Sequence, residues 1–271
     1  MRILIVADIE GVSGVVHPEQ TRPGSVEYER ARLWMTREVN ALVQGALDGG
    51  ATDVWAVDSH GSYRNLLLDE LHPEARLLSG KPRIGGMLAG IVEGGPWDGV
   101  FLAGAHARAG SFGVLAHTIN GQAFTSVNVD GKAVGECFLN AALAGEHGVP
   151  VRLASGDDCL AKEIAPFLAG AEIVTVKQAL ANRCAVHLPF EAVHAALGEA
   201  AAHAVQRDMP PFAPTLPAWV EVQTVQPVFA DVFSLVPGVE RLYPTTVAFE
   251  AESMTMLVRM LNTFSALWAS V

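Results

Sequence analysis

The chain has 271 residues, of which 50% are hydrophobic and only 17% charged, and its formal net charge is −11. An acidic protein is repelled by nucleic-acid backbones and anionic membrane surfaces, so we expect neither of them as a partner. Although the mean hydropathy is +0.29, the sequence has no run of about 18 apolar residues, which a membrane-spanning helix would need.

Short apolar strands and amphipathic helices alternate over the first two thirds of the chain. The β-branched run at 2–7 predicts a buried strand, and apolar residues at a spacing of about 3.6 predict a helix over 28–47. Further strands are predicted at 53–57, 99–103, 151–154 and 172–176, a hairpin arm at 127–129, and helices at 135–145 and 159–168. This alternation is typical of βαβ units and predicts an α/β fold, with a mainly parallel sheet core flanked by helices.

From Pro189 onward the pattern changes. An Ala-rich helix is predicted over 190–206, followed by a proline-dense stretch over 210–217 and then by strands at 220–225 and 245–249 and a helix at 253–268. We therefore predict an α/β metal-binding catalytic core over residues 1–190 and a smaller C-terminal α+β lobe over residues 191–271. The alternative is a lobe packed on the same core as one compact unit.

Ionisable side chains follow three predicted strands at their carboxyl ends. Asp8 and Glu10 follow the first strand, His60 follows the second, and His106 follows the strand at 99–103. Ligands of open parallel sheets bind at these strand ends, where residues far apart in sequence converge. Asp, Glu and His are ligands of zinc and other divalent metals, and neighbouring carboxylates repel one another unless a cation lies between them. The pattern predicts a divalent-metal site; the alternative is a set of ordinary polar residues at loop starts.

Two further residues are candidates for the same site. His117 lies in a glycine-interrupted segment after His106, and it is a candidate ligand, acid–base group or packed surface histidine; an imidazole suits proton transfer near neutral pH. Glu136 stands at the start of the predicted helix over 135–145, where a carboxylate also stabilises the helix terminus. The segment 155–158 (SGDD) either supports metal ligands by hydrogen bonds or caps the next helix.

Several other features indicate no site. The segment 11–14 (GVSG) has neither the spacing of a dinucleotide-binding loop nor that of a P-loop. Three widely spaced cysteines form neither a disulfide framework nor a CxxC zinc site. The first apolar run is short and meets Asp8 and Glu10 at once, unlike a signal peptide. We therefore expect a cytoplasmic protein.

A set of motifs resembles one known family. These are DIEGVSG at 8–14, DSH at 58–60, GAHAR at 104–108, GVLAH at 113–117 and VGE at 134–136. Their order and approximate spacing are similar to those of the D-aminopeptidases of the dipeptide-transport operon type, peptidase family M55. The resemblance extends through SGDD at 155–158 and VKQ at 176–178, and so covers most of the chain.

The resemblance implies a zinc-dependent aminopeptidase that releases N-terminal D-amino acids from short peptides, D-alanyl peptides especially. It implies two Zn²⁺ ions per subunit, held by Asp8, Glu10, His60, His106 and Glu136, with His117 as the catalytic histidine. It also implies a homodecamer of stacked pentameric rings. The family pattern has Ser at the position of Val6, so a hydrogen bond that supports Asp8 is expected to be missing.

Other functions are compatible with the same residues. A di-metal amidohydrolase, esterase or phosphoesterase would use a similar centre, and a non-catalytic metal- or peptide-binding protein linked to peptide uptake would need no proton-transfer residue. The low charge content bears on assembly, because a large homo-oligomer would bury apolar surface between its subunits.

Overall fold

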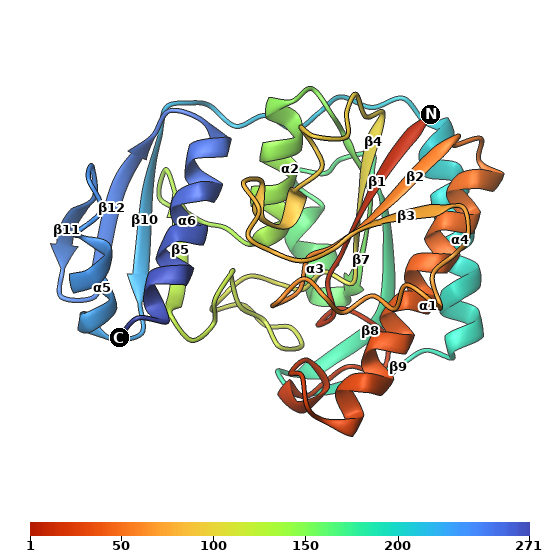
Figure 1. Cartoon of the computed structure of the whole chain (residues 1–271), viewed down its shortest axis with the longest axis horizontal. Coiled ribbons are helices and arrows are strands. Elements are labelled where there is room, and N and C mark those ends of the chain that lie inside the picture. Colours follow the sequence, from red (N-terminus) through yellow and green to blue (C-terminus); the bar gives the residue numbers. More distant parts are fainter.

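The computed structural model describes residues 1–271, which form two β-sheets with helices between and around them (Figure 1). The larger sheet has seven strands in the order β3-β2-β1-β4-β7-β8-β9, and the smaller has five in the order β11-β12-β10-β5-β6. None of the helices has the length and apolar character required to cross a membrane.

The larger sheet is parallel except at one edge. Its parallel strands are β1 (Arg2–Ala7), β2 (Asp53–Asp58), β3 (Ala75–Leu78), β4 (Gly99–Ala103), β7 (Val151–Asp157) and β8 (Glu172–Ala181), and β9 (Cys184–His187) is antiparallel to β8. From β1 the chain first adds strands on one side and then, from β4, on the other. The boundary between β1 and β4 is therefore the switch point at which such sheets bind ligands.

Both faces of this sheet are covered, as the unbroken apolar sequence of β1 requires. Ile3 and Ile5 pack in one apolar cluster with α1 (Val26–Asp48) and α4 (Phe190–Gln206). Leu4 and Val6 point to the opposite face, into the cluster that includes α2 (Glu136–Glu146) and the smaller sheet. Side chains of a strand alternate between faces, so a strand buried on both sides shows no polar alternation.

Helices α1 and α4 approach each other closely at a pair of glycines. A Cβ placed on Gly45 would lie 2.1 Å from the carbonyl oxygen of Gly198. Any larger residue at position 45 would push the two helices apart, because its Cβ would overlap the carbonyl oxygen of Gly198. On the other face, α3 (Asp158–Ile164) follows β7 and packs Leu160 and Ile164 into the second apolar cluster.

The smaller sheet is antiparallel. It lies on the side of α2 that faces away from the larger sheet, and one further helix separates it from α2 (Figure 1). Its strands are β5 (Phe124–Val129), β6 (Lys132–Ala133), β10 (Ala218–Thr224), β11 (Glu240–Tyr243) and β12 (Thr246–Ala251). Helix α6 (Met254–Trp268) packs between this sheet and α2, and α5 (Pro227–Phe233) packs against α6 through stacked Phe233 and Phe264 rings. Two short 3-10 turns complete the fold, η1 (Pro18–Gln20) and η2 (Gly86–Leu88).

The predicted fold class is confirmed: a mixed α/β chain with a mainly parallel sheet flanked by helices and a second antiparallel sheet. Sheet membership does not follow chain order, however. Hairpin β5–β6 belongs to the smaller sheet although it comes early in the chain, and α4 packs on α1 although it comes late. The division between residues 190 and 191 stays a prediction.

Candidate metal centre

The carboxyl ends of β1, β2 and β4 meet at the switch point of the larger sheet and place their polar residues together. Asp8 and Glu10 follow β1, His60 follows β2 and His106 follows β4. Glu136 reaches the same place from the first turn of α2. Asp8, Glu10, His106 and Glu136 are all buried, so the structure brings together the residues that the sequence motifs singled out.

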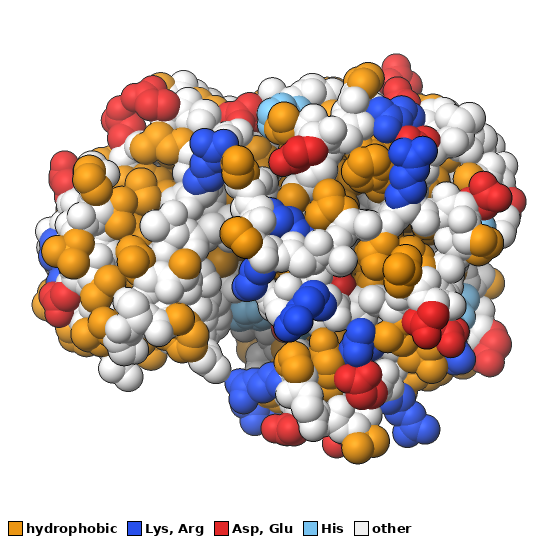
Figure 2. All heavy atoms as spheres, in the orientation of Figure 1, with side chains coloured by type: hydrophobic (Ala, Val, Ile, Leu, Met, Phe, Trp, Pro, Cys, Tyr) orange, Lys and Arg blue, Asp and Glu red, His pale blue; other side chains and the backbone are white.

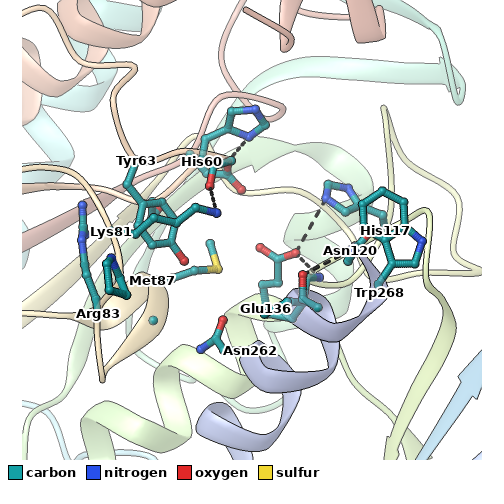
Figure 3. A pocket seen from close by; sticks show the side chains of 18 of the residues that line it. His60, Tyr63, Lys81, Arg83, Met87, His117, Asn120, Glu136, Asn262 and Trp268 are labelled. Carbon is teal, nitrogen blue, oxygen red and sulfur yellow. Dashed lines mark hydrogen bonds and ion pairs between the residues drawn. The ribbon is translucent and has the colours of Figure 1, made fainter. Parts of the chain in front are cut away.

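Asp8, Glu10 and His60 form one half of this centre. His60 Nδ1 lies 3.1 Å from Asp8 Oδ1 and 3.0 Å from Glu10 Oε2. One ligand atom from each residue falls within 4.8 Å of the others, which is close enough for the three to share a metal ion. Figure 3 shows His60 on one wall of a cavity, facing Glu136 across it.

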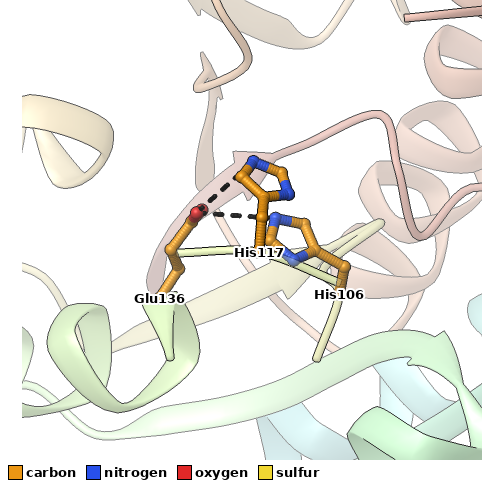
Figure 4. Close-up of side chains that lie close together, drawn as sticks. All are labelled: His106, His117 and Glu136. Carbon is orange, nitrogen blue, oxygen red and sulfur yellow. Dashed lines mark ion pairs between the residues drawn. The ribbon is translucent and has the colours of Figure 1, made fainter. Parts of the chain in front are cut away.

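His106, His117 and Glu136 form the other half (Figure 4). His106 Nε2 lies 3.5 Å and His117 Nε2 3.9 Å from Glu136 Oε1. The two imidazole rings stack with centroids 4.1 Å apart and planes 11° from parallel. His117 is thus beside the predicted ligands, within reach of the same carboxylate.

Asp8 lies between the two halves and faces both. Its Oδ1 is directed to His60, and its Oδ2 lies 3.4 Å from His106 Nε2. A carboxylate that offers one oxygen to each side is the arrangement expected of a ligand that bridges two metal ions. No other carboxylate of the centre approaches histidines from both halves.

All three histidines are oriented alike by the backbone. In each ring one nitrogen contacts a main-chain carbonyl: His60 Nε2 contacts Thr21 O at 2.8 Å, His106 Nδ1 contacts Ala107 O at 3.0 Å and His117 Nδ1 contacts Leu115 O at 2.9 Å. A neutral imidazole that donates one N–H to a carbonyl leaves the lone pair of its other nitrogen free, as metal-binding histidines do. In all three rings that second nitrogen faces a carboxylate.

The orphaned polar atoms of the centre support a bound cation. His106 Nε2 and Glu10 Oε2 are both buried and have no hydrogen-bond partner. Buried polar atoms without partners are rare in folded proteins, and a lone pair cannot bond to a carboxylate lone pair. A divalent cation in each half of the centre would give each of these atoms a partner, so the residues present fit a metal site.

The charges of the centre point the same way. Burial raises the pKa of Asp8, but the interactions with His106 and His60 outweigh burial and hold that pKa well below its ordinary value. Burial lowers the pKa of both histidines, and the facing carboxylates outweigh it and raise each well above the ordinary value. The carboxylates thus require positive charge between them, as protons or as a metal that replaces those protons.

Hydrogen bonds fix the loops that carry the ligands. Asp58 accepts hydrogen bonds from the backbone N–H groups of Asn65 and Leu66, which anchors the loop after His60. In the segment 155–158, Asp157 accepts from Cys159 and Leu160 and thereby caps α3. The same aspartate accepts from the Val114 N–H at 2.7 Å and so also holds the loop before His117. Of the two roles that the sequence left open for this segment, the structure shows the helix cap, whereas a hydrogen bond from Asp157 to a metal ligand is not present.

The loop after β1 contains a support that sequence reasoning missed. Lys177, only 1% exposed, donates hydrogen bonds from Nζ to the carbonyl oxygens of Glu10, Val12 and Val15 at 2.6–2.8 Å. Buried Glu38 accepts from the Ser13 N–H of the same loop at 2.8 Å. Nothing in the sequence pattern marks Glu38, which lies in the middle of α1. Lys177 could have been noticed as the charged residue of the VKQ motif.

A cavity of about 690 Å³ opens in front of the centre. Asp8, His60, His117 and Glu136 form part of its wall. The remaining wall comes from residues that the sequence did not mark as functional (Figure 3). Some of them belong to η2 and to α6, such as Asn262 and Trp268, and others, such as Tyr63, Lys81 and Arg83, lie in the loops after β2 and β3.

Comparison with known protein families matches residues 1–263 to the family described as Peptidase_M55, D-aminopeptidase. The chain belongs to peptidase family M55. It is 33% identical over 258 residues to the D-aminopeptidase of Bacillus subtilis (strain 168), which covers 94% of this chain and 93% of that protein. The resemblance indicated by the motifs is therefore confirmed.

The fold of this M55 member is also that of a solved structure. It superposes on the Zn-dependent D-aminopeptidase DppA from Bacillus subtilis, described as a self-compartmentalizing protease, with a TM-score of 0.95 and 31% identity. The match covers 100% of this chain and 99% of that chain. The expectation of a D-aminopeptidase-type hydrolase is thus confirmed at the level of the family, whereas the role of each site residue stays a prediction.

Proposed function

We propose that this chain is a zinc aminopeptidase that removes the N-terminal residue from short peptides, with a preference for D-amino acids and for D-alanyl peptides in particular. Two Zn²⁺ ions per subunit would be held by Asp8, Glu10, His60, His106 and Glu136. The observation that carries the proposal is the position of Asp8, whose two carboxylate oxygens face histidines of opposite halves.

Zinc, when bound at such a centre, polarises a carbonyl and lowers the pKa of water. The protein's own residues supply orientation and proton transfer. His117 Nδ1 contacts the Leu115 carbonyl, which leaves Nε2 free on the cavity side, 3.9 Å from Glu136. We propose that His117 Nε2 takes up a proton and then passes it to the departing amine, or in this protonated form donates a hydrogen bond to the oxygen that becomes negative.

Val6 bears on the support of Asp8. It is buried among apolar side chains and offers no hydrogen bond. Asp8 Oδ1 instead accepts a hydrogen bond from the Ile9 N–H at 2.8 Å and is held by His60 at 3.1 Å. These contacts favour an intact metal site despite the absence of the family serine.

The test is a metal-loaded assay with D-Ala-D-Ala, L-Ala-L-Ala and a phosphate monoester. We expect hydrolysis of the D,D-dipeptide in preference to the L,L-dipeptide and no release of phosphate. Preferential phosphate release would identify a phosphoesterase instead. Saturable peptide binding without any product, at every zinc loading, would identify a binding protein linked to peptide uptake.

We further propose a homodecamer of stacked pentameric rings in the cytoplasm. Large apolar side chains remain exposed on the isolated chain around the β8–β9 edge: Leu180 at 62%, Val186 at 50% and Leu188 at 48%, with Phe112 at 86% in the loop before His117. Exposed large apolar side chains of this kind are often covered at subunit interfaces. Light scattering after size-exclusion chromatography should give about ten times the mass of one chain, and a monomer would contradict the assembly.

A further inference from the structure

The cavity in front of the metal centre carries two cationic side chains, Lys81 and Arg83. They are its only Lys or Arg residues, and neither forms an ion pair with a carboxylate. The chain as a whole has 29 acidic residues and only 18 basic ones. The cavity therefore holds two positive charges that no carboxylate of the protein approaches within ion-pair distance. Figure 2 shows Lys and Arg side chains bordering the hollow between the two sheets, where a histidine is also visible.

Tyr63 connects the two cations. Its ring lies 5.3 Å from Lys81 Nζ and 4.3 Å from Arg83 Cζ, as in cation–π contacts. Its backbone has a φ of 60°, a conformation that bulky residues rarely adopt and that is often found at functional sites. The Tyr63 ring thus holds both positive charges on one wall of the cavity.

Lys81 is the cation nearer to the metal centre. Its ammonium donates a hydrogen bond to the Gly61 carbonyl oxygen at 2.7 Å, and Gly61 immediately follows the candidate ligand His60. This is the only hydrogen bond that Lys81 Nζ makes with the protein, and the side chain is exposed to the cavity (Figure 3). An ammonium has three N–H donors, so two of them are free for a ligand.

Arg83 is held in a different way. Its Nε donates to the Gly80 carbonyl and its Nη2 to Leu78 O at 3.4 Å. Its Nη1 is buried and has no partner. Arg83 therefore supports the wall and adds a second positive charge behind Tyr63, whereas Lys81 is free to contact what enters the cavity.

The chemistry of a short peptide matches this arrangement. When its N-terminal residue is at the metal centre, its free C-terminal carboxylate lies only one or two residues away, at about 3.5 Å per residue. Lysine is a common partner of carboxylates, and a charged hydrogen bond is stronger than a neutral one. A longer peptide would present an uncharged amide to the same ammonium.

We propose that Lys81 binds the C-terminal carboxylate of a short peptide substrate and thereby selects short peptides over internal or blocked ones. The proposal rests on the aminopeptidase function proposed above. It adds a residue that recognises the end of the peptide opposite to the one that is cleaved.

The test compares D-Ala-D-Ala with D-Ala-D-Ala amide, which lacks the terminal negative charge. The native protein should prefer the free acid by about tenfold or more in kcat/KM, through KM, which corresponds to about 1.4 kcal/mol. K81M should lose this preference to within about twofold. The matched control is K132M, which removes an exposed lysine of β6 outside the cavity.

Calorimetric binding of the two peptides to the zinc-loaded proteins separates this proposal from the aminopeptidase function. If neither peptide is cleaved but K81M alone loses the tighter binding of the free acid, the carboxylate site stands and the peptidase function falls. If K81M keeps the preference of the native protein, or if the native protein does not distinguish acid from amide, the assignment of Lys81 is wrong.

Discussion

Replacement of Glu38 by Gln should change how the stability of the protein depends on pH. The Glu38 side chain is 1% exposed, and burial raises the pKa of its carboxyl from 4.5 to about 6. The folded state therefore retains a proton that the unfolded chain has already lost between these pH values. The stabilising contribution is complete below pH 4.5 and is lost as the pH rises through 6. At about 1.4 kcal/mol per pH unit, the total is about 2 kcal/mol.

The assay is thermal unfolding of the native protein and E38Q from pH 4 to 7.5 at fixed zinc. Gln has no titrating group, and its side-chain oxygen can still accept from the Ser13 N–H. E38Q should therefore gain stability relative to the native protein as the pH rises, by about 2 kcal/mol or roughly 4 °C. Titration of the metal ligands affects both proteins and cancels in the difference. Two parallel curves would refute the assignment of a raised pKa to Glu38.

Three further substitutions test the metal centre and its support. E10Q should lower bound zinc below two equivalents by elemental analysis, whereas exposed E27Q should not; two full equivalents in E10Q would exclude Glu10 as a ligand. H117A should retain its zinc while kcat falls by about 10²-fold or more, as expected for loss of a proton-transfer group; unchanged turnover would remove His117 from the reaction. K177M should lose at least about 2 kcal/mol of stability in urea, because three buried carbonyls lose their donor. Exposed K162M is its control, and equal urea midpoints for the two variants would contradict the structural role of Lys177.

The centre was predictable from sequence because its residues follow strands. Asp8, His60 and His106 each stand just beyond a short apolar run, and the geometry of parallel sheets brings such positions together. Glu136 and His117 were candidates with an alternative role on the sequence pattern alone, and the family resemblance was needed to assign them to the site. Their loop and helix are positioned by tertiary contacts, such as the bond from Val114 to Asp157.

What the sequence did not indicate depends on long-range pairing. Strand β7 continues through Ser155-Gly156-Asp157, beyond the predicted strand end at 154, because this segment pairs with β8. The short strands β3, β9 and β11 and helix α5 were not predicted, since four to seven residues carry too little periodicity. The cavity wall was not predicted either, because Lys81 and Arg83 line a cavity only once η2 and α6 pack around the same space.

The path of the chain between β4 and β7 has a mechanical consequence. This one segment leaves the larger sheet with His106 and His117, contributes β5 and β6 to the smaller sheet, and returns with Glu136 at the start of α2. The half of the metal centre formed by His106, His117 and Glu136 therefore lies on the chain segment that connects the two sheets. A hinge that opened the cleft would pull on His117 and Glu136 and separate them from Asp8. The architecture therefore favours a cleft of fixed width, into which a substrate must fit without help from domain motion.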